Sequence, residues 1–229
     1  MISVVIPTLN SEAGLAATMT ALVPATVDGL VREVVIVDGG STDRTLRIAD
    51  EAGARVVRSN PGRGTQLRTG ASQTRFGWLL FLHSDTVLQP GWEREAAAFI
   101  ERVEAGKRPE AAAAFRFALD DLGFWPRLVE WGVSIRCLFF RLPYGDQGLL
   151  VPRRLYDRLG GYRDLPLMED VDIVRRLGWS RTTVLRAAAV TSAVRYRRDG
   201  YVARMARNLT CLSLYYLRVP ARVIARIYG

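Results

Sequence analysis

The chain has 229 residues, of which 49% are hydrophobic and 24% are charged. These values are ordinary for a globular protein of one domain and exclude extensive disorder. The formal net charge is +9, and arginine supplies almost all of the positive charge, because Lys107 is the only lysine. A basic chain suits a phosphorylated ligand, nucleic acid or an anionic membrane, although a bias toward arginine without any function gives the same composition.

The cysteines and the start of the chain bear on where the protein works. Cys137 and Cys211 are too few for a disulfide framework or a zinc site. No basic stretch precedes an apolar one at the N-terminus, and no run reaches the ~18 apolar residues that a membrane helix needs. The sequence therefore predicts a cytoplasmic protein.

The first ninety residues alternate between short apolar runs and segments with a helical pattern. Strands are predicted at residues 3–6, 34–37, 55–58 and 78–82, and helices at residues 12–22, 43–52 and 65–75. The strands are apolar along their whole length, which is typical of a parallel sheet with helices on both faces. This part of the chain therefore predicts an α/β fold.

Beyond residue 90 the elements are spaced less evenly. A helix is predicted where five apolar residues share one face, namely Trp92, Ala96, Phe99, Ile100 and Val103. Strands are also predicted at 111–117, 149–151, 184–186 and 190–194, and helices within 122–142 and at 168–177 and 201–217. No repeat or linker interrupts the chain. We therefore predict one domain over residues 1–198 and an amphipathic helical extension over residues 199–229.

Polar residues follow three of the predicted strands. Ligands of open parallel sheets bind beyond the carboxyl ends of the strands, which here are residues 7–10, 38–43 and 83–86. Asp38 follows an apolar run directly and can accept hydrogen bonds from a base or a ribose hydroxyl. The same segment would also form a plain tight turn with Ser41 or Thr42 as a helix cap, so both interpretations stay open.

The next strand end and the loop before it suggest a phosphate ligand. Asp85 ends a buried strand and suits Mg²⁺, which takes one or two carboxylates together with substrate phosphates. His83 is the only histidine, and a packed or solvated position explains it better than metal ligation. In the loop 60–66, Arg63 can reach a phosphate. That loop matches neither the P-loop nor the dinucleotide fingerprint, so a plain loop is the simpler interpretation.

Glu169 and Asp170 begin a predicted helix. Acidic residues are favoured there by the helix dipole alone, by about 0.3–1 kcal/mol. The functional alternative is a general base that takes a proton from an acceptor hydroxyl.

The order of these motifs resembles the inverting glycosyltransferases of family 2, which have the nucleotide-diphospho-sugar transferase (GT-A) fold. The likeness covers roughly the first 180 residues. Five motifs carry it: residues 4–10 with Glu12, residues 37–43, residues 62–64 with Gln66, residues 81–85 at the place of the Asp-x-Asp motif, and Glu169 with Asp170.

The resemblance implies a three-layer α/β/α domain that binds a nucleotide-sugar and Mg²⁺ or Mn²⁺. It implies Asp170 as the catalytic base and Asp85 as the metal ligand. It further implies a donor site formed by Pro7, Thr8, Asn10, Glu12, Asp38, Gly62, Arg63, Gln66, Ser84, Asp85, Asp146 and Gln147. The acceptor hydroxyl would displace the nucleotide in a single step.

The sequence departs from the family pattern at two places. His83 replaces the first aspartate of Asp-x-Asp, which leaves Asp85 alone to bind the metal. The Gln-x-x-Arg-Trp motif of processive synthases is absent, which favours a single transfer. Residues 83–86, 145–148 and 168–171 also resemble a small bacterial subgroup described as arsenosugar-biosynthesis glycosyltransferases, as a hint about the acceptor.

Three other functions fit parts of the sequence. A sugar-phosphate nucleotidyltransferase usually has a longer, lysine-containing glycine-rich loop near the first strand, which residues 8–12 do not provide. A nucleotide-sugar-binding protein that has lost catalysis would agree with His83. Nucleic-acid binding rests on charge alone, because the chain has no aromatic–basic motif of that kind.

The predicted C-terminal helix combines arginines with an apolar face, as in Arg204, Arg207, Leu209 and Leu212. It could lie on the inner face of an anionic membrane, where lipid-linked acceptors reside. Packing on the domain, or on a second subunit of a homodimer, is the simpler interpretation. The acceptor is therefore either a small molecule or lipid-linked, and residues 120–142 are expected to shape its side of the site.

Overall fold

The computed structural model describes residues 1–140 and 142–228, so Arg141, within the expected acceptor-side stretch, lies outside the described residues. The strands are β1 Ile2–Thr8, β2 Val31–Asp38, β3 Arg55–Arg58, β4 Trp78–Phe81, β5 Thr86–Leu88, β6 Ala112–Leu119, β7 Leu149–Pro152 and β8 Thr182–Thr191. The helices are α1 Glu12–Val27, α2 Thr45–Glu51, α3 Arg63–Ser72, α4 Trp92–Glu104, α5 Phe124–Phe140, α6 Arg153–Arg158, α7 Glu169–Leu177, α8 Val194–Asp199, α9 Tyr201–Tyr216 and α10 Ala221–Tyr228. Two 3₁₀ turns, η1 Gly145–Gln147 and η2 Trp179–Arg181, complete the described part.

The strands form one sheet in the order β3-β2-β1-β4-β7-β6-β8-β5. The pairs β1–β2, β1–β4, β2–β3 and β6–β8 are parallel, and β7 and β5 run antiparallel to their neighbours. The mostly parallel sheet predicted from the sequence is therefore confirmed. The carboxyl ends of β1, β2 and β4 share one edge of the sheet, which is where such sheets bind ligands.

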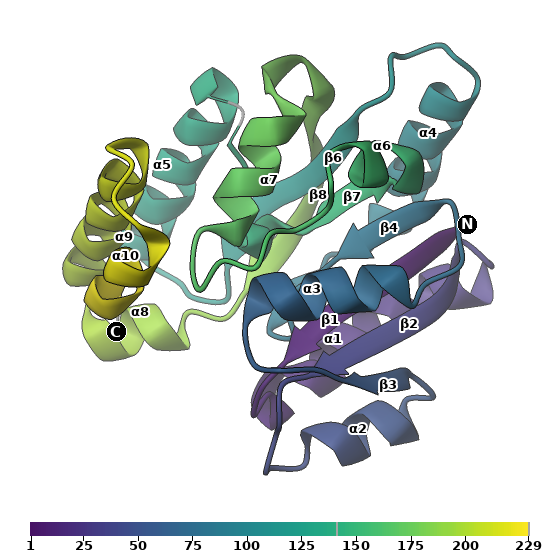
Figure 1. Ribbon diagram of the computed structural model, residues 1–229, viewed down its shortest axis with the longest axis horizontal. Helices are drawn as coiled ribbons and strands as arrows, with labels where there is room; N and C mark the ends of the chain where they lie inside the picture. Colours follow the sequence, from purple (N-terminus) through teal and green to yellow (C-terminus); the bar gives the residue numbers. More distant parts are fainter. Residues whose placement is uncertain (141, 229) are drawn as a thin grey trace.

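Helices cover both faces of the sheet (Figure 1). The side chains of Ile2, Val4 and Ile6 point to the face covered by α1 and α4, where they join the largest buried apolar cluster. Val5 points to the opposite face, which α3, α6 and α7 cover. Gly70 allows α3 to approach this face closely, because a Cβ at that position would lie 2.3 Å from Cγ1 of Val5. The expected three-layer α/β/α architecture is thus present.

The structure differs from the predicted elements mainly in the second half. β8 is one strand over Thr182–Thr191, not two, and Val194 begins α8 instead of ending a strand. The sequence pattern did not predict one continuous β8, because alanine has a weak strand propensity. In the structure these alanines pair with β6, with a single irregularity in register. The short elements β5, α6 and α10 were not predicted, and α1 continues past Pro24 to Val27.

The C-terminal helices α8, α9 and α10 lie beside α5 at one side of the molecule (Figure 1). A third apolar cluster joins Phe117 of β6 and Val129 of α5 to Ala193, with Tyr196 and Tyr201 packed against it. Within the part of the chain that the structure describes, no helix combines the length and apolarity that crossing a membrane requires. The division at residue 198 stays a prediction.

Candidate functional site

A cavity of about 460 Å³ opens at the carboxyl ends of β1 and β4. The sequence-predicted site residues that line it are Pro7, Thr8, Gly62, Arg63, Gln66, Ser84, Asp85, Asp146 and Asp170. The strand-end loops, the start of α3, η1 and the start of α7 supply them, so segments up to 163 residues apart in the numbering meet here. Four other predicted residues lie outside the lining among the described residues, namely Asn10, Glu12, Asp38 and Gln147.

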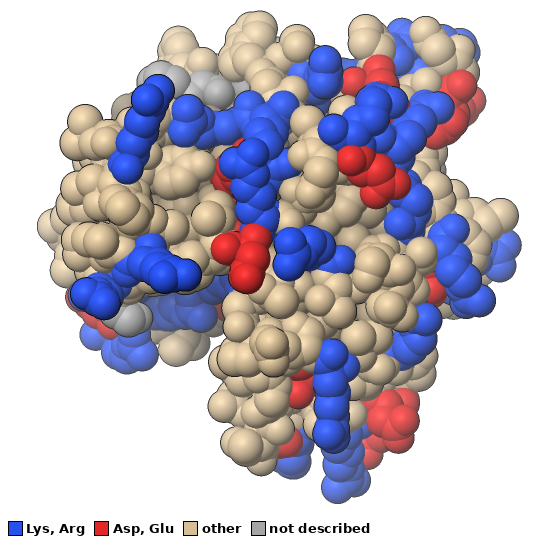
Figure 2. Space-filling view, in the orientation of Figure 1, with Lys and Arg blue, Asp and Glu red and all other residues tan. Residues whose placement is uncertain are grey.

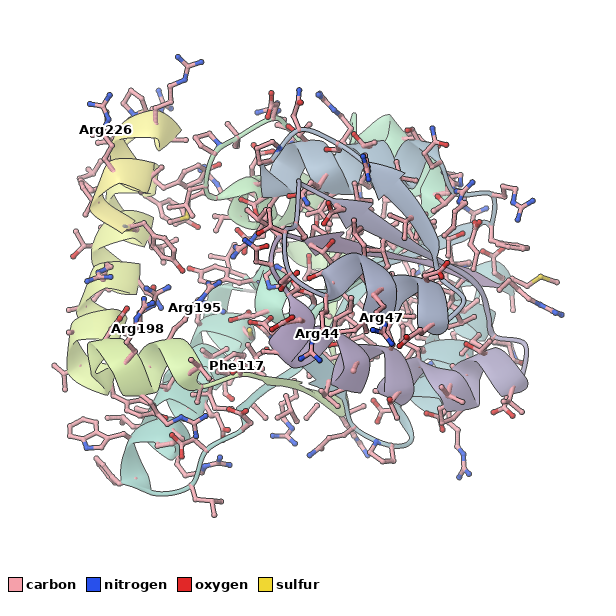
Figure 3. All side chains as sticks on the ribbon, turned by 90° about the horizontal axis from the view of Figure 1, so that it is seen from below. Arg44, Arg47, Phe117, Arg195, Arg198 and Arg226 are labelled. Carbon is pink, nitrogen blue, oxygen red and sulfur yellow. The ribbon has the colours of Figure 1, made fainter. Side chains whose placement is uncertain are left out.

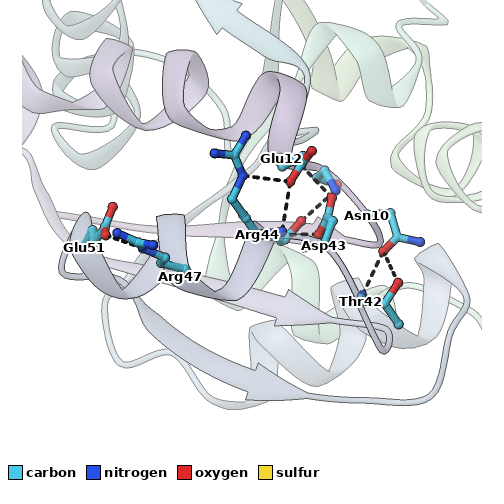
Figure 4. A network of polar contacts seen from close by, with 9 residues as sticks. Asn10, Glu12, Thr42, Asp43, Arg44, Arg47 and Glu51 are labelled. Carbon is cyan, nitrogen blue, oxygen red and sulfur yellow. Dashed lines mark hydrogen bonds and ion pairs between the residues drawn. The ribbon is translucent and has the colours of Figure 1, made fainter.

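Asn10 and Glu12 tie the loop after β1 to the loop after β2 (Figure 4). The Asn10 Oδ1 atom accepts a hydrogen bond from the Thr42 amide at 2.9 Å. The Glu12 carboxylate accepts from the Arg44 amide at 3.0 Å, and the Glu12 amide donates to Asp43 at 3.1 Å. These hydrogen bonds hold the loop after β1, which contributes Leu9 and Ser11 to the cavity lining, against the loop after β2.

Asp38 ends β2, where it is only 2% exposed. Its carboxylate accepts hydrogen bonds from the amides of Gly40 and Ser41, both at 2.9 Å, and from the hydroxyls of Ser41 and Thr8. Burial alone would raise the pKa of Asp38, but these hydrogen bonds lower the pKa by more, so it lies below its ordinary value. Asp38 is thus a charged anchor of the turn. A direct contact from Asp38 to a nucleotide stays a prediction.

Gln66 of α3 holds the ends of β1 and β2 together. Its Nε2 atom donates to the carbonyl oxygens of Thr8 at 2.8 Å and Val37 at 2.7 Å. At the start of the same helix, Gly64 permits a close approach, because a Cβ there would lie 2.1 Å from the carbonyl oxygen of Arg163. This packing fixes the position of Arg63 at the cavity.

The loop after β4 brings His83, Ser84 and Asp85 to the cavity. The Ser84 hydroxyl donates to the Ser11 hydroxyl at 2.9 Å, which links this loop to the one after β1. A Cβ added to Gly145 would lie 2.7 Å from Nε2 of His83, so the imidazole rests directly on that glycine. Burial, and the charges of two nearby arginines, hold the pKa of His83 well below its ordinary value, so the ring is neutral near pH 7.

Glu169 and Asp170 occupy the first turn of α7, next to Met168. Met168 has a φ of +66°, a left-handed conformation that is unfavourable for a residue with a side chain. The Asp170 Oδ2 atom accepts a hydrogen bond from the Gly145 amide at 2.8 Å, which orients the carboxylate. Glu169 is 2% exposed, and burial together with the charge of Asp170 raises its pKa to about 7, although Arg63 lies 3.9 Å away.

Two buried polar atoms of η1 and its N-cap have no partner within the described residues. They are the Oδ1 atom of Asp146 and the hydroxyl of Tyr144, and both residues line the cavity. Burial raises the pKa of Asp146 to about 6; the charge of Arg136 opposes this shift and the charge of Asp170 adds to it. Buried polar groups are normally hydrogen-bonded, so these two atoms are open positions for a ligand.

Gln147 lies behind the cavity wall and is 1% exposed. Its Nε2 atom donates to the carbonyl oxygen of Phe115 at 2.9 Å, and its Oε1 atom accepts from Arg136 and from the Tyr144 amide, each at 3.2 Å. Gln147 therefore fixes η1, and with it Asp146, against β6.

Sequence reasoning missed the contribution of the C-terminal half to the cavity. Arg136 of α5 stacks on the Tyr144 ring, 3.4 Å from the ring centre, and Arg204 of α9 bonds to the Tyr228 hydroxyl. Arg195 lies between the C-terminal helices and the rest of the domain (Figure 3) and also lines the cavity. Arginine is so abundant that the sequence does not distinguish these residues from the others. Figure 2 shows basic side chains spread over the visible face, with acidic ones between them.

A comparison with known protein families shows to which family the chain belongs. Residues 3–117, about half of the chain, match glycosyl transferase family 2. The chain belongs to glycosyl transferase family 2. This confirms the resemblance carried by the motifs of the first half, whereas the arsenosugar subgroup stays a prediction.

Two curated relatives give the degree of similarity to this family 2 protein. Glucosyl-3-phosphoglycerate synthase of Mycobacterium tuberculosis is 38% identical over an alignment of length 95 that covers 38% of this chain and 29% of the relative. A PGL/p-HBAD biosynthesis glycosyltransferase of Mycobacterium bovis is 36% identical over an alignment of length 183 that covers 71% of this chain and 63% of the relative. The chain therefore matches less than two thirds of the length of these relatives.

Solved structures of glucosyl-3-phosphoglycerate synthase from Mycobacterium tuberculosis share the fold. The complex with Mn²⁺ and UDP-glucose superposes with a TM-score of 0.65 at 22% identity, over 96% of this chain and 80% of that one. The complex with phosphoglyceric acid gives 0.65 at 24% identity, over 96% and 81%. The GT-A fold expected from the sequence is confirmed.

Proposed function

We propose that this protein transfers a sugar from a nucleotide-diphosphate-sugar to an acceptor hydroxyl, with inversion, in a single displacement. The observation that carries the proposal is the meeting of three kinds of group in one cavity. Asp85 and Arg63 suit a diphosphate, Asp170 suits proton transfer, and Asp146 has an open oxygen for a hydroxyl. Membership in family 2 and the UDP-glucose complex of the related synthase support this assignment.

The donor end of the cavity is the part between the loops after β1 and β4 and the start of α3. Here we assign Pro7, Thr8, Gly62, Arg63, Gln66, Ser84 and Asp85 to the nucleotide-sugar. Arg63 can bind a phosphate through its planar guanidinium. Asn10, Glu12 and Asp38 would keep the loops around the nucleotide in place, and Gln147 would keep Asp146 in place, as their hydrogen bonds indicate.

A divalent cation, Mg²⁺ or Mn²⁺, would be held by Asp85 together with the donor diphosphate. Among the described residues no group of three His, Cys, Asp or Glu side chains could hold a metal on its own. One carboxylate fits a cation that takes most of its other ligands from substrate phosphates and water, as Mg²⁺ commonly does. When bound, the cation neutralises the charge that develops on the departing diphosphate.

Asp170 would act as the base. Its Oδ2 atom keeps a lone pair beyond the one used by the Gly145 amide, and the carboxylate lines the cavity. The acceptor oxygen forms the new bond to the anomeric carbon while the bond from that carbon to the diphosphate breaks, and the acceptor proton passes to Asp170. An ordinary carboxylate can accept this proton, because the hydroxyl becomes acidic only as the bond forms.

The acceptor, a small molecule or a lipid-linked one, would contact the open atoms of Asp146 and Tyr144. Because the pKa of Asp146 is about 6, this carboxyl lies close to its midpoint of titration, and a bound ligand can favour either its ionised or its protonated form. Both states can hydrogen-bond a hydroxyl.

The variant Asp170→Asn tests the proposed reaction. It should lower the transfer rate by about 10²–10⁴-fold, because it removes the proton acceptor, while UDP binding measured by calorimetry stays close to that of the wild type. Asp50→Asn, an exposed change on α2, is the matched control and should retain full activity. Near-full turnover of Asp170→Asn would exclude Asp170 as the base.

The same assay separates the rival functions. Wild-type protein that binds UDP-sugars with Mn²⁺ but neither hydrolyses nor transfers them would be a binding protein. Formation of a nucleotide-sugar from a nucleoside triphosphate and a sugar phosphate would identify a nucleotidyltransferase. No thermal stabilisation by any nucleotide-sugar would contradict the proposal as a whole.

A further inference from the structure

Helix α5 is apolar on two opposite sides. Val129 and Cys137 are buried against the domain. On the other side, Phe124, Trp131 and Leu138 follow one another at intervals of seven residues and are 71%, 64% and 71% exposed. A spacing of seven residues returns to the same face of a helix, so these three side chains form one exposed stripe. We call this stripe the α5 face.

The α5 face is larger than its three central residues. Leu128 and Ile135 lie between them at helical spacing, and Phe139 and Trp125 lie beside them, 67% and 44% exposed. Helices that are apolar on opposite sides are normally buried, because leaving large apolar side chains in water is unfavourable. No described residue covers this face. A contiguous exposed apolar surface of this kind marks a site of interaction.

A groove of about 540 Å³ runs beside the α5 face, between α5 and the strands β6 and β8. Leu138 and Ser134 line its helix side, and Arg116 and Arg186 line its strand side. Arg116 donates only to the Arg186 carbonyl oxygen, at 3.4 Å, and within the described residues neither guanidinium pairs with a carboxylate. Two guanidinium groups that pair with no carboxylate among the described residues therefore adjoin an exposed apolar helix, while the Arg186 backbone amide donates to Glu95 at 2.8 Å.

We propose that the α5 face docks the protein on an anionic lipid bilayer. The apolar side chains enter the interfacial region, and Arg116 and Arg186 bind the phosphates of the lipid headgroups. Tryptophan, as at Trp125 and Trp131, is enriched where proteins meet the membrane interface, and arginines near an anionic surface strengthen binding by electrostatic attraction.

Charge distinguishes the bilayer from a second copy of this chain. A two-fold dimer through the α5 face would bring each subunit's Arg116 and Arg186 toward the same interface, in a protein whose net charge is already +9. Like charges across an interface are unfavourable, whereas an anionic bilayer complements them. The opposite side of α5 contributes Val133 and Arg136 to the cavity, so the helix that contacts the bilayer also forms a wall of the site. The proposal does not depend on the proposed transfer reaction.

Vesicle sedimentation of the full chain tests the proposal. Wild-type protein should sediment with vesicles that contain phosphatidylglycerol and far less with pure phosphatidylcholine. Trp131→Glu should lower the fraction bound at least tenfold, because it places a charge in the centre of the α5 face. Arg116→Gln combined with Arg186→Gln should weaken binding to the anionic vesicles only. Circular dichroism and the melting temperature should stay unchanged, since these side chains are exposed.

Two matched variants keep the test falsifiable. Val27→Glu on α1, where Val27 is 80% exposed, should bind vesicles like the wild type. Leu217→Glu, after α9, tests the C-terminal helices, since Leu217 is 75% exposed. The proposal is overturned if wild type ignores anionic vesicles or if Leu217→Glu abolishes binding while Trp131→Glu does not. It is also overturned if ultracentrifugation shows a dimer that Trp131→Glu dissociates.

Discussion

The carboxylate at the end of β2 lies behind the cavity, whereas those around the start of α7 line it, and the fold treats the two kinds differently. Asp38 accepts four hydrogen bonds from its own loop and from Thr8, and its pKa lies below its ordinary value. Glu169 and Asp146 are also enclosed, but they lack that number of donors, and their pKa values rise to about 7 and about 6.

This difference shows how one residue type serves two purposes. A carboxylate whose lone pairs are occupied by amides is a structural anchor, and its charge is stabilised before any ligand arrives. A carboxylate that is buried without such partners is unstable as an anion, and binding a proton, a hydroxyl group or a cation stabilises it. We therefore expect changes on the β2 side to affect mainly stability, and changes on the α7 side to affect mainly chemistry and pH dependence.

The largest effect on stability is expected from Asp38→Ala. It removes the acceptor of the Gly40 and Ser41 amides in a partly exposed turn, and it leaves the Thr8 hydroxyl only its contact with the Val37 carbonyl oxygen at 3.4 Å. We expect the free energy of unfolding to fall by about 2 kcal/mol, since water can replace the acceptor only at the exposed amide and an unsatisfied buried group costs about 1–3 kcal/mol. Urea denaturation measures this loss.

Asp85→Ala is the counterpart at the cavity itself. It should leave the urea midpoint nearly unchanged but weaken Mn²⁺-dependent binding of a UDP-sugar in calorimetry, because it removes the proposed metal ligand. Equal losses of stability in both variants would contradict the division between anchoring and reacting carboxylates.

An intermediate effect is expected from pH. The pKa of Glu169 rises from 4.5 to about 7 on folding, so between these values the folded chain binds more protons than the unfolded chain. The contribution of Glu169 to the free energy of unfolding then falls as the pH rises through this window, while the lowered pKa of His83 acts in the opposite direction. Glu169→Gln should flatten that fall, as melting temperatures recorded between pH 4.5 and 8 would show. The exposed variant Glu51→Gln should keep the wild-type slope, and an unchanged slope in Glu169→Gln would refute the assignment.

The smallest effect is expected from Arg44→Ala. The Arg44 side chain is 76% exposed and pairs with Glu12 at 3.2 Å, while the Arg44 amide holds the same carboxylate in wild type and variant alike. Exposed ion pairs contribute little, so the loss should stay below about 1 kcal/mol in the same urea experiment. A loss as large as that of Asp38→Ala would show that the loop depends on the guanidinium instead of the backbone.

The two halves of the domain were unequally predictable from the sequence. β1 to β4 are apolar runs with helices between them, and many of the predicted donor-site residues follow these strands directly. The hydrophobic pattern therefore indicated the fold, and the motifs at the strand ends indicated the donor side. β6 and β8 are rich in alanine and hold together through pairing with each other, which a local pattern does not contain.

The second wall of the cavity depends on contacts over long sequence distances. Arg136, Arg195 and Arg204 reach the site only because α5, α8 and α9 pack against β6, and nothing in their local sequence separates them from other arginines. The roles of Asp38 and Glu169 could not be separated either, because both are acidic residues at predicted element ends. The number of donors around each carboxylate, and the charge of Asp170 beside Glu169, distinguish them.

Gly145 lies between His83 and Asp170 and leaves no room for a side chain. A Cβ there would lie 2.7 Å from Nε2 of His83 and 3.4 Å from Oδ2 of Asp170, while the glycine amide donates to that same Asp170 atom. One extra carbon would force the ring to move, whereas its distance to the Asp170 carboxylate would be that of an ordinary contact. The spacing between the histidine and the aspartate therefore depends on a residue without a side chain, so a glycine that takes no part in the chemistry positions two groups that line the cavity.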